Sequence, residues 1–487
     1  MMSSRLAQTF DVARPSLSTS IPWAWVWVSR SPQKDRLIYL LGSAEAIGPA
    51  WLVVNMSRFL LTVWPLRTHL HPFIAVAHGL RERGHEVAFY TGAAGLELVQ
   101  KQGFPCFPFR AVDDAQVNGA VHGLVSSNWR PGKWQQFMLG TISGQLNDLT
   151  EIWKSWQPDA VLCDIALWGP ILVMHELQNV PLALLSHVAT CILPSPENPL
   201  PGANWLLKAS PLHALEPVIA WTWRRASAGV PRAANKLRKE WGLAPLSGTV
   251  TEFTGQMPLY LVPGIPEFDG NRSDLPPSVR YVGPCLWDKT PDQNPPAWIH
   301  KVPRDLPRVI VVEGSIYPDR PCLLELAAKG LAHLPLNVVL VAGEGRSLDT
   351  LNTDLGPLAP NIRLERWTPL SDLLPIADVV VAGGDSETVM ACLNKHVPMV
   401  LLPTILDQPE IAWRLSEAEA GIRIPRRKRS PERLAAAVSR VLAEPKFRGN
   451  AARLAEEFSE RSGADMAARL LEDMVTGAPS LMMRSAH

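Results

Sequence analysis

Residues 58–92 read RFLLTVWPLRTHLHPFIAVAHGLRERGHEVAFYTG, and this stretch decides the fold. Residues 59–64 are a short, continuously apolar run, which predicts a strand buried on both faces. After His71 and Pro72, apolar residues recur at helical spacing from Phe73 to Leu80, and Gly84 is suited to ending the helix. A second apolar run follows at residues 87–90. A strand, a helix and another strand within about 30 residues predict a βαβ unit and therefore a parallel sheet.

The same alternation continues along the chain, with one interruption. Strands are predicted at residues 160–163, 182–185, 258–262 and 280–282, and then at 309–313, 337–342, 362–365, 378–381 and 399–403. Residues 287–307 are rich in proline and lack periodicity, which indicates a linker. We therefore expect an α/β protein with two facing Rossmann-like domains. The expected parts are a weakly structured N-terminal extension at 1–56, a first domain at 57–286, the linker at 287–307, a second domain at 308–460, and at 461–487 a crossover helix that returns to the first domain, followed by a tail.

Composition narrows the class of protein. The 487 residues are 47% hydrophobic and 19% charged, and the formal net charge is +1, so no global field favours nucleic acid or an anionic membrane. The apolar patches in residues 1–55 are interrupted by charges, which disfavours both a spanning helix and a secretory signal. The six cysteines form no C-x-x-C pair, which is typical of a reducing compartment. We expect a cytoplasmic protein without stable membrane insertion.

Common catalytic and cofactor motifs are absent or incomplete in the sequence. It contains no G-x-S-x-G, H-E-x-x-H or G-x-x-x-x-G-K-[ST] motif. Gly343 and Gly345 follow a predicted strand, and Glu365 ends the next one, which superficially fits a dinucleotide-binding fingerprint. The third glycine is missing, and residues 349–360 are expected to form a loop. A tight glycine turn is therefore the favoured interpretation.

Several motifs in a fixed order resemble one large enzyme family. They are FLLTVWPLRTHLHP at 59–72, LRERGHEVAFYTG at 80–92, NIRLERWTP at 361–369, ADVVVAGG at 377–384, VP at 397–398 and PTILDQ at 403–408. Together they resemble the UDP- and TDP-sugar-dependent glycosyltransferases, including macrolide, sterol and plant secondary-metabolite enzymes, over residues 57–475. The resemblance implies the GT-B architecture, with an acceptor-binding first domain and a nucleotide-sugar-binding second domain. It also implies inverting transfer of a hexose to a hydroxyl of a small acceptor.

The catalytic pair implied by this resemblance is His69 and Asp164. A hydroxyl is a poor nucleophile, so a base must remove its proton, and an imidazole is a better base when a carboxylate holds its other nitrogen. His69 is expected in the loop after the first strand and Asp164 at the end of the strand 160–163, both at the carboxyl edge of the sheet. The alternatives are a capping or core role for His69 and a helix N-cap role for Asp164. His85, at the opposite edge, is interpreted as structural.

The expected donor site lies at the carboxyl edge of the second sheet. Glycine turns and helix N-termini suit a departing diphosphate, so no metal or other cofactor is expected. The resemblance implies that Trp367 stacks on the nucleobase and that Asp407 and Gln408 bind hydroxyls of the donor sugar. Two alternatives stay open, namely that Trp367 belongs to the core of the domain and that Asp407 is the N-cap of the following helix. The donor-binding candidates are Gly314, Ser315, Trp367, Gly383, Gly384, Ser386, Thr388, Asp407 and Gln408.

The sequence also departs from the family pattern. Thr68 replaces a glycine, Ala382 replaces a histidine that contacts the diphosphate, Leu370 replaces a glutamine, and the ribose-binding glutamate has no clear counterpart. These departures keep two alternatives open, namely an inactive homologue that acts as a binding partner and a nucleotide-sugar epimerase or NAD-dependent enzyme. Tryptophans in the predicted acceptor region favour an apolar acceptor such as a terpenoid, polyketide or lipid: Trp129, Trp134 and Trp205.

Overall fold

The computed structural model describes residues 25–31, 34–42, 52–125, 131–195, 198, 218, 222, 229–288, 294–314, 317, 320 and 322–477. The chain divides into two compact units, Met1–Met56 and Ser57–His487. In the first unit, where we expected little structure, the strands β1 (Trp25–Ser31), β2 (Lys34–Gly42) and β3 (Leu52–Asn55) pair in an antiparallel sheet. Tryptophan, valine, isoleucine and tyrosine are frequent in these strands, and such residues favour extended backbone.

The second unit begins with a parallel sheet of seven strands. Their order is β10-β9-β8-β7-β4-β5-β6, which is the doubly wound order with its reversal between β4 and β7. The strands are β4 (Arg58–Thr62), β5 (Glu86–Thr91), β6 (Cys106–Pro108), β7 (Ala160–Asp164), β8 (Leu182–Leu185), β9 (Leu259–Val262) and β10 (Val279–Tyr281). The helices are α1 (Arg67–Glu82), α2 (Ala93–Lys101), α3 (Asp114–Val125), α4 (Pro131–Gly140), α5 (Ile142–Trp156), the π-helical turn η1 (Pro170–Met174), α6 (His175–Gln178), α9 (Gly229–Glu240), α10 (Val250–Thr254) and α11 (Pro266–Asp269).

A second parallel sheet of six strands follows in the order β13-β12-β11-β14-β15-β16, with its reversal between β11 and β14. The strands are β11 (Arg308–Val312), β12 (Asn337–Val341), β13 (Ile362–Glu365), β14 (Val379–Ala382), β15 (Met399–Leu401) and β16 (Gly421–Arg423). The helices are η3 (Ile299–Lys301), α12 (Cys322–Gly330), α13 (Leu348–Leu355), α14 (Leu370–Leu373), η4 (Leu374–Ile376), α15 (Ser386–Asn394), α16 (Gln408–Glu417), η5 (Arg426–Lys428), α17 (Pro431–Ala443), α18 (Lys446–Ser459) and α19 (Ala464–Thr476). The two Rossmann-like sheets confirm the predicted fold class.

Both faces of each parallel sheet are buried, as the continuous apolar runs predict. Leu60 of β4 packs into one core cluster, while its neighbours Phe59 and Leu61 pack into another on the opposite face. The second sheet repeats this division, with Ile310 in one cluster and Val311 in the other. Helices on both faces therefore hold the carboxyl ends of the strands in place, where ligands of such sheets bind.

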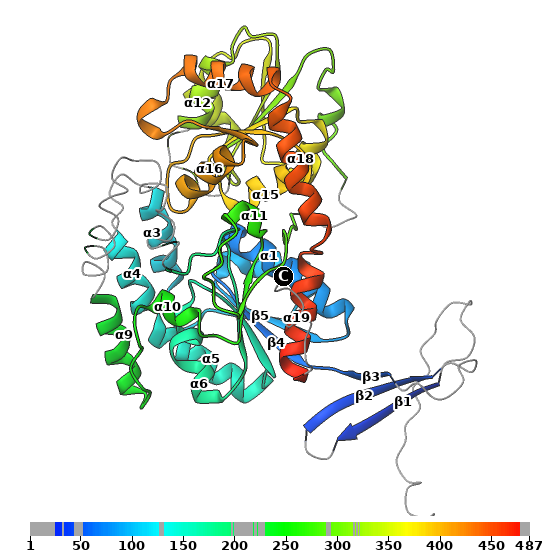
Figure 1. The fold of residues 1–487 in the computed structure, drawn as a ribbon, viewed down its shortest axis with the longest axis vertical. Helices are drawn as coiled ribbons and strands as arrows, with labels where there is room; N and C mark the ends of the chain where they lie inside the picture. Colours follow the sequence, from blue (N-terminus) through cyan, green and yellow to red (C-terminus); the bar gives the residue numbers. More distant parts are fainter. Residues whose placement is uncertain are drawn as a thin grey trace, which may run out of the picture. The chain divides into compact units, whose positions relative to one another are not determined.

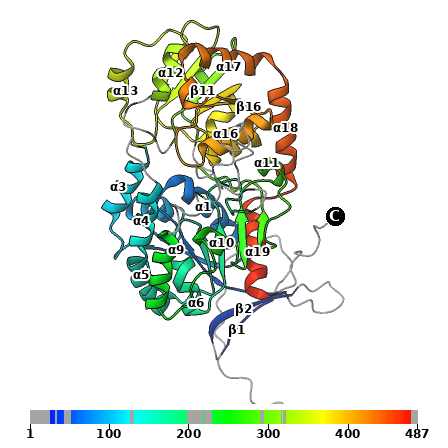
Figure 2. The ribbon, with the colours of Figure 1, turned by 60° about the vertical axis from the view of Figure 1, so that its left-hand side comes forward.

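The last two helices connect the two domains. Figures 1 and 2 show α18 beside the second domain and α19 beside the first. α19 packs against α1, and the two helices lie close together at Gly79, where a Cβ atom would lie 3.2 Å from Ala468 Cβ. Arg83 Nε donates a hydrogen bond of 2.9 Å to Glu472. The predicted crossover helix is therefore confirmed.

Two local predictions were wrong. α1 begins at Arg67, because the Leu66 carbonyl accepts hydrogen bonds from the N–H groups of His69 and Leu70, so His69 lies in the first helical turn rather than in a loop. Residues 348–355, expected as loop, form the helix α13. Its N-cap Ser347 accepts a hydrogen bond from the Thr350 N–H.

Within the part of the chain that the structure describes, no helix combines the length and the apolar composition that a bilayer-spanning segment needs. The six cysteines are free, and four of them are buried. The buried ones behave as small core residues.

Candidate active site

The reversal points of the two sheets bring the candidate residues together. Ligands of doubly wound sheets bind beside such a point, at the carboxyl ends of the strands. In the first sheet His69 follows β4, Asp164 ends β7, and these strands are paired. In the second sheet Gly314 follows β11 and Asp385 follows β14, and these strands are also paired. The catalytic and donor-binding candidates therefore come from equivalent positions of the two domains.

His69 and Asp164 form a direct hydrogen bond. His69 Nδ1 lies 2.5 Å from Asp164 Oδ2, and the carboxylate is fully buried. Asp164 Oδ1 accepts a further hydrogen bond of 2.9 Å from the Ala166 N–H, which fixes the carboxylate. When His69 Nδ1–H donates to Asp164, the lone pair of the imidazole is on Nε2. This is the geometry of an oriented general base.

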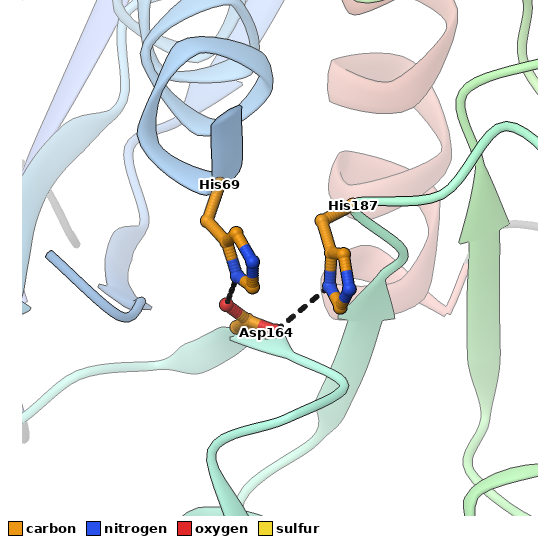
Figure 3. A group of neighbouring side chains, drawn as sticks. All are labelled: His69, Asp164 and His187. Atoms are coloured by element: carbon orange, nitrogen blue, oxygen red, sulfur yellow. Dashed lines mark hydrogen bonds and ion pairs between the residues drawn. The ribbon is translucent and has the colours of Figure 1, made fainter. Parts of the chain in front are cut away.

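His187, which the sequence did not single out, completes the cluster. Its ring stacks on that of His69, with centroids 3.9 Å apart and planes inclined by 15°, and its Nδ1 lies 3.4 Å from Asp164 Oδ1 (Figure 3). His187 follows β8, the neighbour of β7. His187 could have been predicted from the sequence, because it is a polar residue shortly after a buried strand, at the same edge of the sheet as Asp164.

The charge state of Asp164 is set by its two imidazole neighbours. Burial opposes ionisation, but the charge of His69, its hydrogen bond and the nearby His187 outweigh it and hold the pKa of Asp164 below its ordinary value. The carboxylate is therefore ionised in the folded protein. An ionised Asp164 stabilises the imidazolium that forms when His69 accepts a proton.

The same three side chains also resemble a metal-binding set, since their ligand atoms lie within 4.8 Å of one another. Two imidazoles and a carboxylate suit zinc, which binds such atoms at about 2.0–2.2 Å. His69 Nδ1 and Asp164 Oδ2, however, are 2.5 Å apart, which is a hydrogen-bond distance. The observed geometry therefore fits an oriented base better than a metal centre.

Three of the donor candidates line one small pocket between the domains. Gly314, Trp367 and Thr388 lie there together with Arg67 of α1. The Arg67 guanidinium lies 5.5 Å from the centre of the Trp367 ring and also forms an ion pair with Glu344. The cavity is about 40 Å³, whereas ligand sites usually occupy roughly 300–1,000 Å³. A cavity of this size is too small to hold a nucleotide sugar.

Of the remaining donor candidates, Ser315 lies outside the described residues, whereas the others are described. Ser386 Oγ accepts a hydrogen bond of 2.8 Å from the Ala189 N–H of the first domain. Gly383 lies beside Gln408, whose Oε1 accepts from the Thr404 N–H at 2.8 Å. Gly384 has φ +99°, a conformation that favours glycine. The described pocket is not lined by four of these candidates, namely Gly383, Gly384, Ser386 and Gln408.

Asp407 precedes α16, but its side chain makes no capping hydrogen bond. Burial raises the pKa of Asp407 to about 6, and His187 is close enough to oppose this rise electrostatically. Leu406 before it has φ +52°, a strained conformation for a side chain other than glycine. Asp407 is thus held near the His69–Asp164–His187 cluster without a structural hydrogen bond of its own to the helix.

The glycine turn at residues 343–345 has a structural explanation. The Tyr317 ring occupies the space that a Cβ at Gly343 would need, and the Tyr317 hydroxyl donates to the Glu344 carbonyl. The Gly343 N–H donates to the Glu313 carboxylate at 2.9 Å. This backbone donor is thus already satisfied, which agrees with the interpretation as a tight turn.

The acceptor region is only partly described. Trp129 and Trp205 lie outside the described residues, and only the backbone of Trp134, in α4, is described.

Comparisons with known proteins identify the family to which the chain is related. Residues 327–474 match the family described as "Erythromycin biosynthesis protein CIII-like, C-terminal domain". The chain is 29% identical to the 4'-demethylrebeccamycin synthase of Lentzea aerocolonigenes over 428 residues, covering 86% of this chain and 100% of that protein. It is 32% identical to a PGL/p-HBAD biosynthesis glycosyltransferase of Mycobacterium tuberculosis over 427 residues, covering 86% of this chain and 92% of that protein.

Solved structures share the fold. The kitacinnamycin glycosyltransferase superposes with a TM-score of 0.68 at 20% identity, covering 86% of this chain and 100% of that one. A spinosyn rhamnosyltransferase in complex with thymidine diphosphate superposes with a TM-score of 0.63 at 19% identity and the same coverage. With its two Rossmann-like domains and its full-length relatives, the chain belongs to the nucleotide-sugar-dependent glycosyltransferase family and is a glycosyltransferase.

Proposed function

We propose that this enzyme transfers a hexose from a UDP- or TDP-sugar to a hydroxyl of a small, apolar acceptor, with inversion at the anomeric carbon. The observation that carries the proposal is the 2.5 Å hydrogen bond between His69 and the buried Asp164. It leaves His69 Nε2 as the base for the acceptor hydroxyl. A single in-line displacement by that hydroxyl breaks the bond to the diphosphate and inverts the anomeric carbon.

The proposed roles of the donor site follow from its position at the second reversal point. Gly314 and the turn at Gly383 and Gly384 offer backbone N–H groups to the diphosphate, Trp367 offers its ring to the nucleobase, and Asp407 with Gln408 binds sugar hydroxyls. Backbone and helix dipoles offset the leaving-group charge in this proposal, so it includes no metal ion. Domain closure excludes water and limits hydrolysis of the donor.

The relatives support the choice of substrates. The names of two of them refer to rebeccamycin and to PGL/p-HBAD biosynthesis, and one structural neighbour is in complex with thymidine diphosphate. A natural product or lipid precursor with a free hydroxyl is therefore the acceptor class that we propose. The relatives named glycosyltransferases do not favour an epimerase or a non-catalytic partner.

A thermal-shift panel of UDP, TDP and their sugars tests the donor first. A ligand at 100 times its Kd stabilises the folded protein by about 2.7 kcal/mol, which such a measurement detects. We expect one nucleotide family to shift the wild type and Asp407→Ala to lose the part of the shift that depends on the sugar. A wild type that none of these ligands stabilises contradicts the proposal.

Turnover then tests the base. With the donor identified, acceptors are screened by release of the nucleoside diphosphate, and His69→Ala is compared with His78→Ala. His78 lies in the same helix but contacts Arg81 and Phe104 instead of the cluster, which makes it a matched control. We expect His69→Ala to abolish transfer and His78→Ala to retain it. Equal activity of the two variants contradicts the role of His69.

A further inference from the structure

His71 presents an unused buried nitrogen at the interface of the two domains. It lies in α1, two residues after His69, and its side chain is 4% exposed. Its Nδ1 lies 2.5 Å from Oε1 of Glu387 in the second domain, and Trp287 packs against its ring. Its Nε2 is buried and has no hydrogen-bond partner in the described structure. A buried imidazole nitrogen without a partner is costly and calls for a ligand.

The pocket that His71 lines is the one in which we place the donor diphosphate. Gly314 and Thr388 line it as well, and so do two carboxylates at the start of α15, those of Asp385 and Glu387. Asp385 accepts a hydrogen bond of 2.9 Å from the Thr388 N–H, so an acidic side chain already uses a backbone donor that an anion would need. A diphosphate bound here therefore needs a compensating cation.

The described pocket is lined by two basic side chains. Arg67 is already paired with Glu344 and lies over the Trp367 ring, toward the expected nucleobase. His71 is the other, and Glu387 supplies its counter-charge. Ala382, at the end of β14, contributes only a methyl group. The group placed to approach the phosphates therefore comes from the first domain.

We propose that His71 binds the donor diphosphate by donating a hydrogen bond from Nε2 to a phosphate oxygen, while Nδ1–H donates to Glu387. This inference rests on the proposed function. The donor enters when the domains separate, and closure then brings His71 against the diphosphate held at Gly314. In this arrangement both ring nitrogens carry a proton, Nδ1–H pointing to Glu387 and Nε2–H to the phosphate. Donor binding and domain closure are thereby coupled through one side chain.

The test compares a nucleoside diphosphate with its nucleoside by isothermal titration calorimetry. The probes are UDP with uridine and TDP with thymidine, and the variants are His71→Leu, His71→Gln and the control His78→Leu. His71→Leu removes both hydrogen bonds, and His71→Gln retains a side-chain N–H donor. We expect His71→Leu to weaken binding of the diphosphate about 10- to 100-fold, as for loss of a charge-assisted hydrogen bond, and to leave nucleoside affinity within about twofold. His71→Gln recovers part of the loss, and His78→Leu changes neither affinity.

The outcomes separate this inference from the proposed function. If the wild type binds neither diphosphate, the proposed function fails and this inference fails with it. If the wild type binds one of them and His71→Leu binds it equally well, only the role of His71 is overturned. Equal weakening of diphosphate and nucleoside also overturns it, because His71 then shapes the pocket instead of contacting phosphate. A thermal unfolding scan of each variant confirms that the titrated protein is folded.

Discussion

Replacement of Asp164 by asparagine tests the catalytic geometry more sharply than removal of the base itself. The wild-type carboxylate accepts hydrogen bonds from His69 and from the Ala166 N–H, and it lies within ion-pair distance of His187. Asparagine preserves the size of the side chain but has one acceptor oxygen and no charge. His69 therefore loses the charge that stabilises its protonated form and the constraint on its tautomer, while the base itself remains.

The expected magnitude follows from these contacts. A hydrogen bond to a charged group contributes about 1.5–3 kcal/mol, which at about 1.36 kcal/mol per tenfold change corresponds to a roughly 10- to 160-fold lower kcat. In serine proteases, the same substitution leaves the histidine in the wrong tautomer and lowers kcat about 10⁴-fold. We therefore expect Asp164→Asn to lower kcat by between about 10-fold and 10⁴-fold. Donor KM is expected to change little, because Asp164 does not line the donor pocket.

The assay is steady-state release of nucleoside diphosphate at saturating acceptor, for the wild type and for Asp164→Asn. Because asparagine has one acceptor oxygen, the substitution leaves at least one buried N–H group without its acceptor, and some loss of stability is expected. Circular dichroism at the assay temperature confirms that the variant is folded. A kcat within about threefold of the wild type refutes the reasoning, because the lower end of the worked range is tenfold. A fall in kcat/KM that comes only from a higher donor KM also refutes it. The substitution would then have weakened binding of the ground state and the transition state equally, without a specific loss of transition-state stabilisation.

Three further predictions concern the donor site, the crossover helix and metal dependence. Burial raises the pKa of Asp407 to about 6, so ionisation of this carboxyl group destabilises the folded protein. Asp407→Asn should therefore raise Tm relative to the wild type above pH 6 but not at pH 4. A Tm difference in scanning fluorimetry that does not depend on pH contradicts this prediction. Leu471 of α19 is fully buried against α1, so Leu471→Ala should lower the free energy of unfolding, measured in urea, by about 2–5 kcal/mol. Arg469 of the same helix is exposed, and Arg469→Ala should lower it by less than about 1 kcal/mol. Similar losses for the two variants argue against tight docking of α19. EDTA should leave turnover unchanged, and a loss that Mg²⁺ restores shows that the diphosphate is stabilised by a metal ion.

The sequence predicted the fold because its strands are buried on both faces. Runs such as residues 59–64 and 309–313 leave no polar face, so parallel sheets covered by helices on both sides were the consistent interpretation. The meeting of His69 with Asp164 followed from topology, since His69 follows β4, Asp164 ends the neighbouring strand β7, and both lie at one sheet edge. Their roles as base and orienter stay predictions.

Features that depend on contacts across the molecule could not be predicted. The His71–Glu387 pair joins residues 316 positions apart in two domains, and no local pattern encodes such a contact. The stacking of His187 on His69 depends on the direction of a loop after β8. The start of α1 was misplaced because Pro72 suggested a helix beginning, whereas Leu66 begins the hydrogen bonding earlier. The Ser347 cap of α13, in contrast, was visible in the sequence and was overlooked.

The stereochemistry of the product tests the central claim most directly. A donor sugar of known anomeric configuration is incubated with enzyme and acceptor, and the anomeric proton coupling of the isolated glycoside is measured by NMR. If His69, oriented by Asp164, activates the acceptor for a single in-line displacement, the product has the opposite anomeric configuration to the donor. A product that retains the donor configuration contradicts the account.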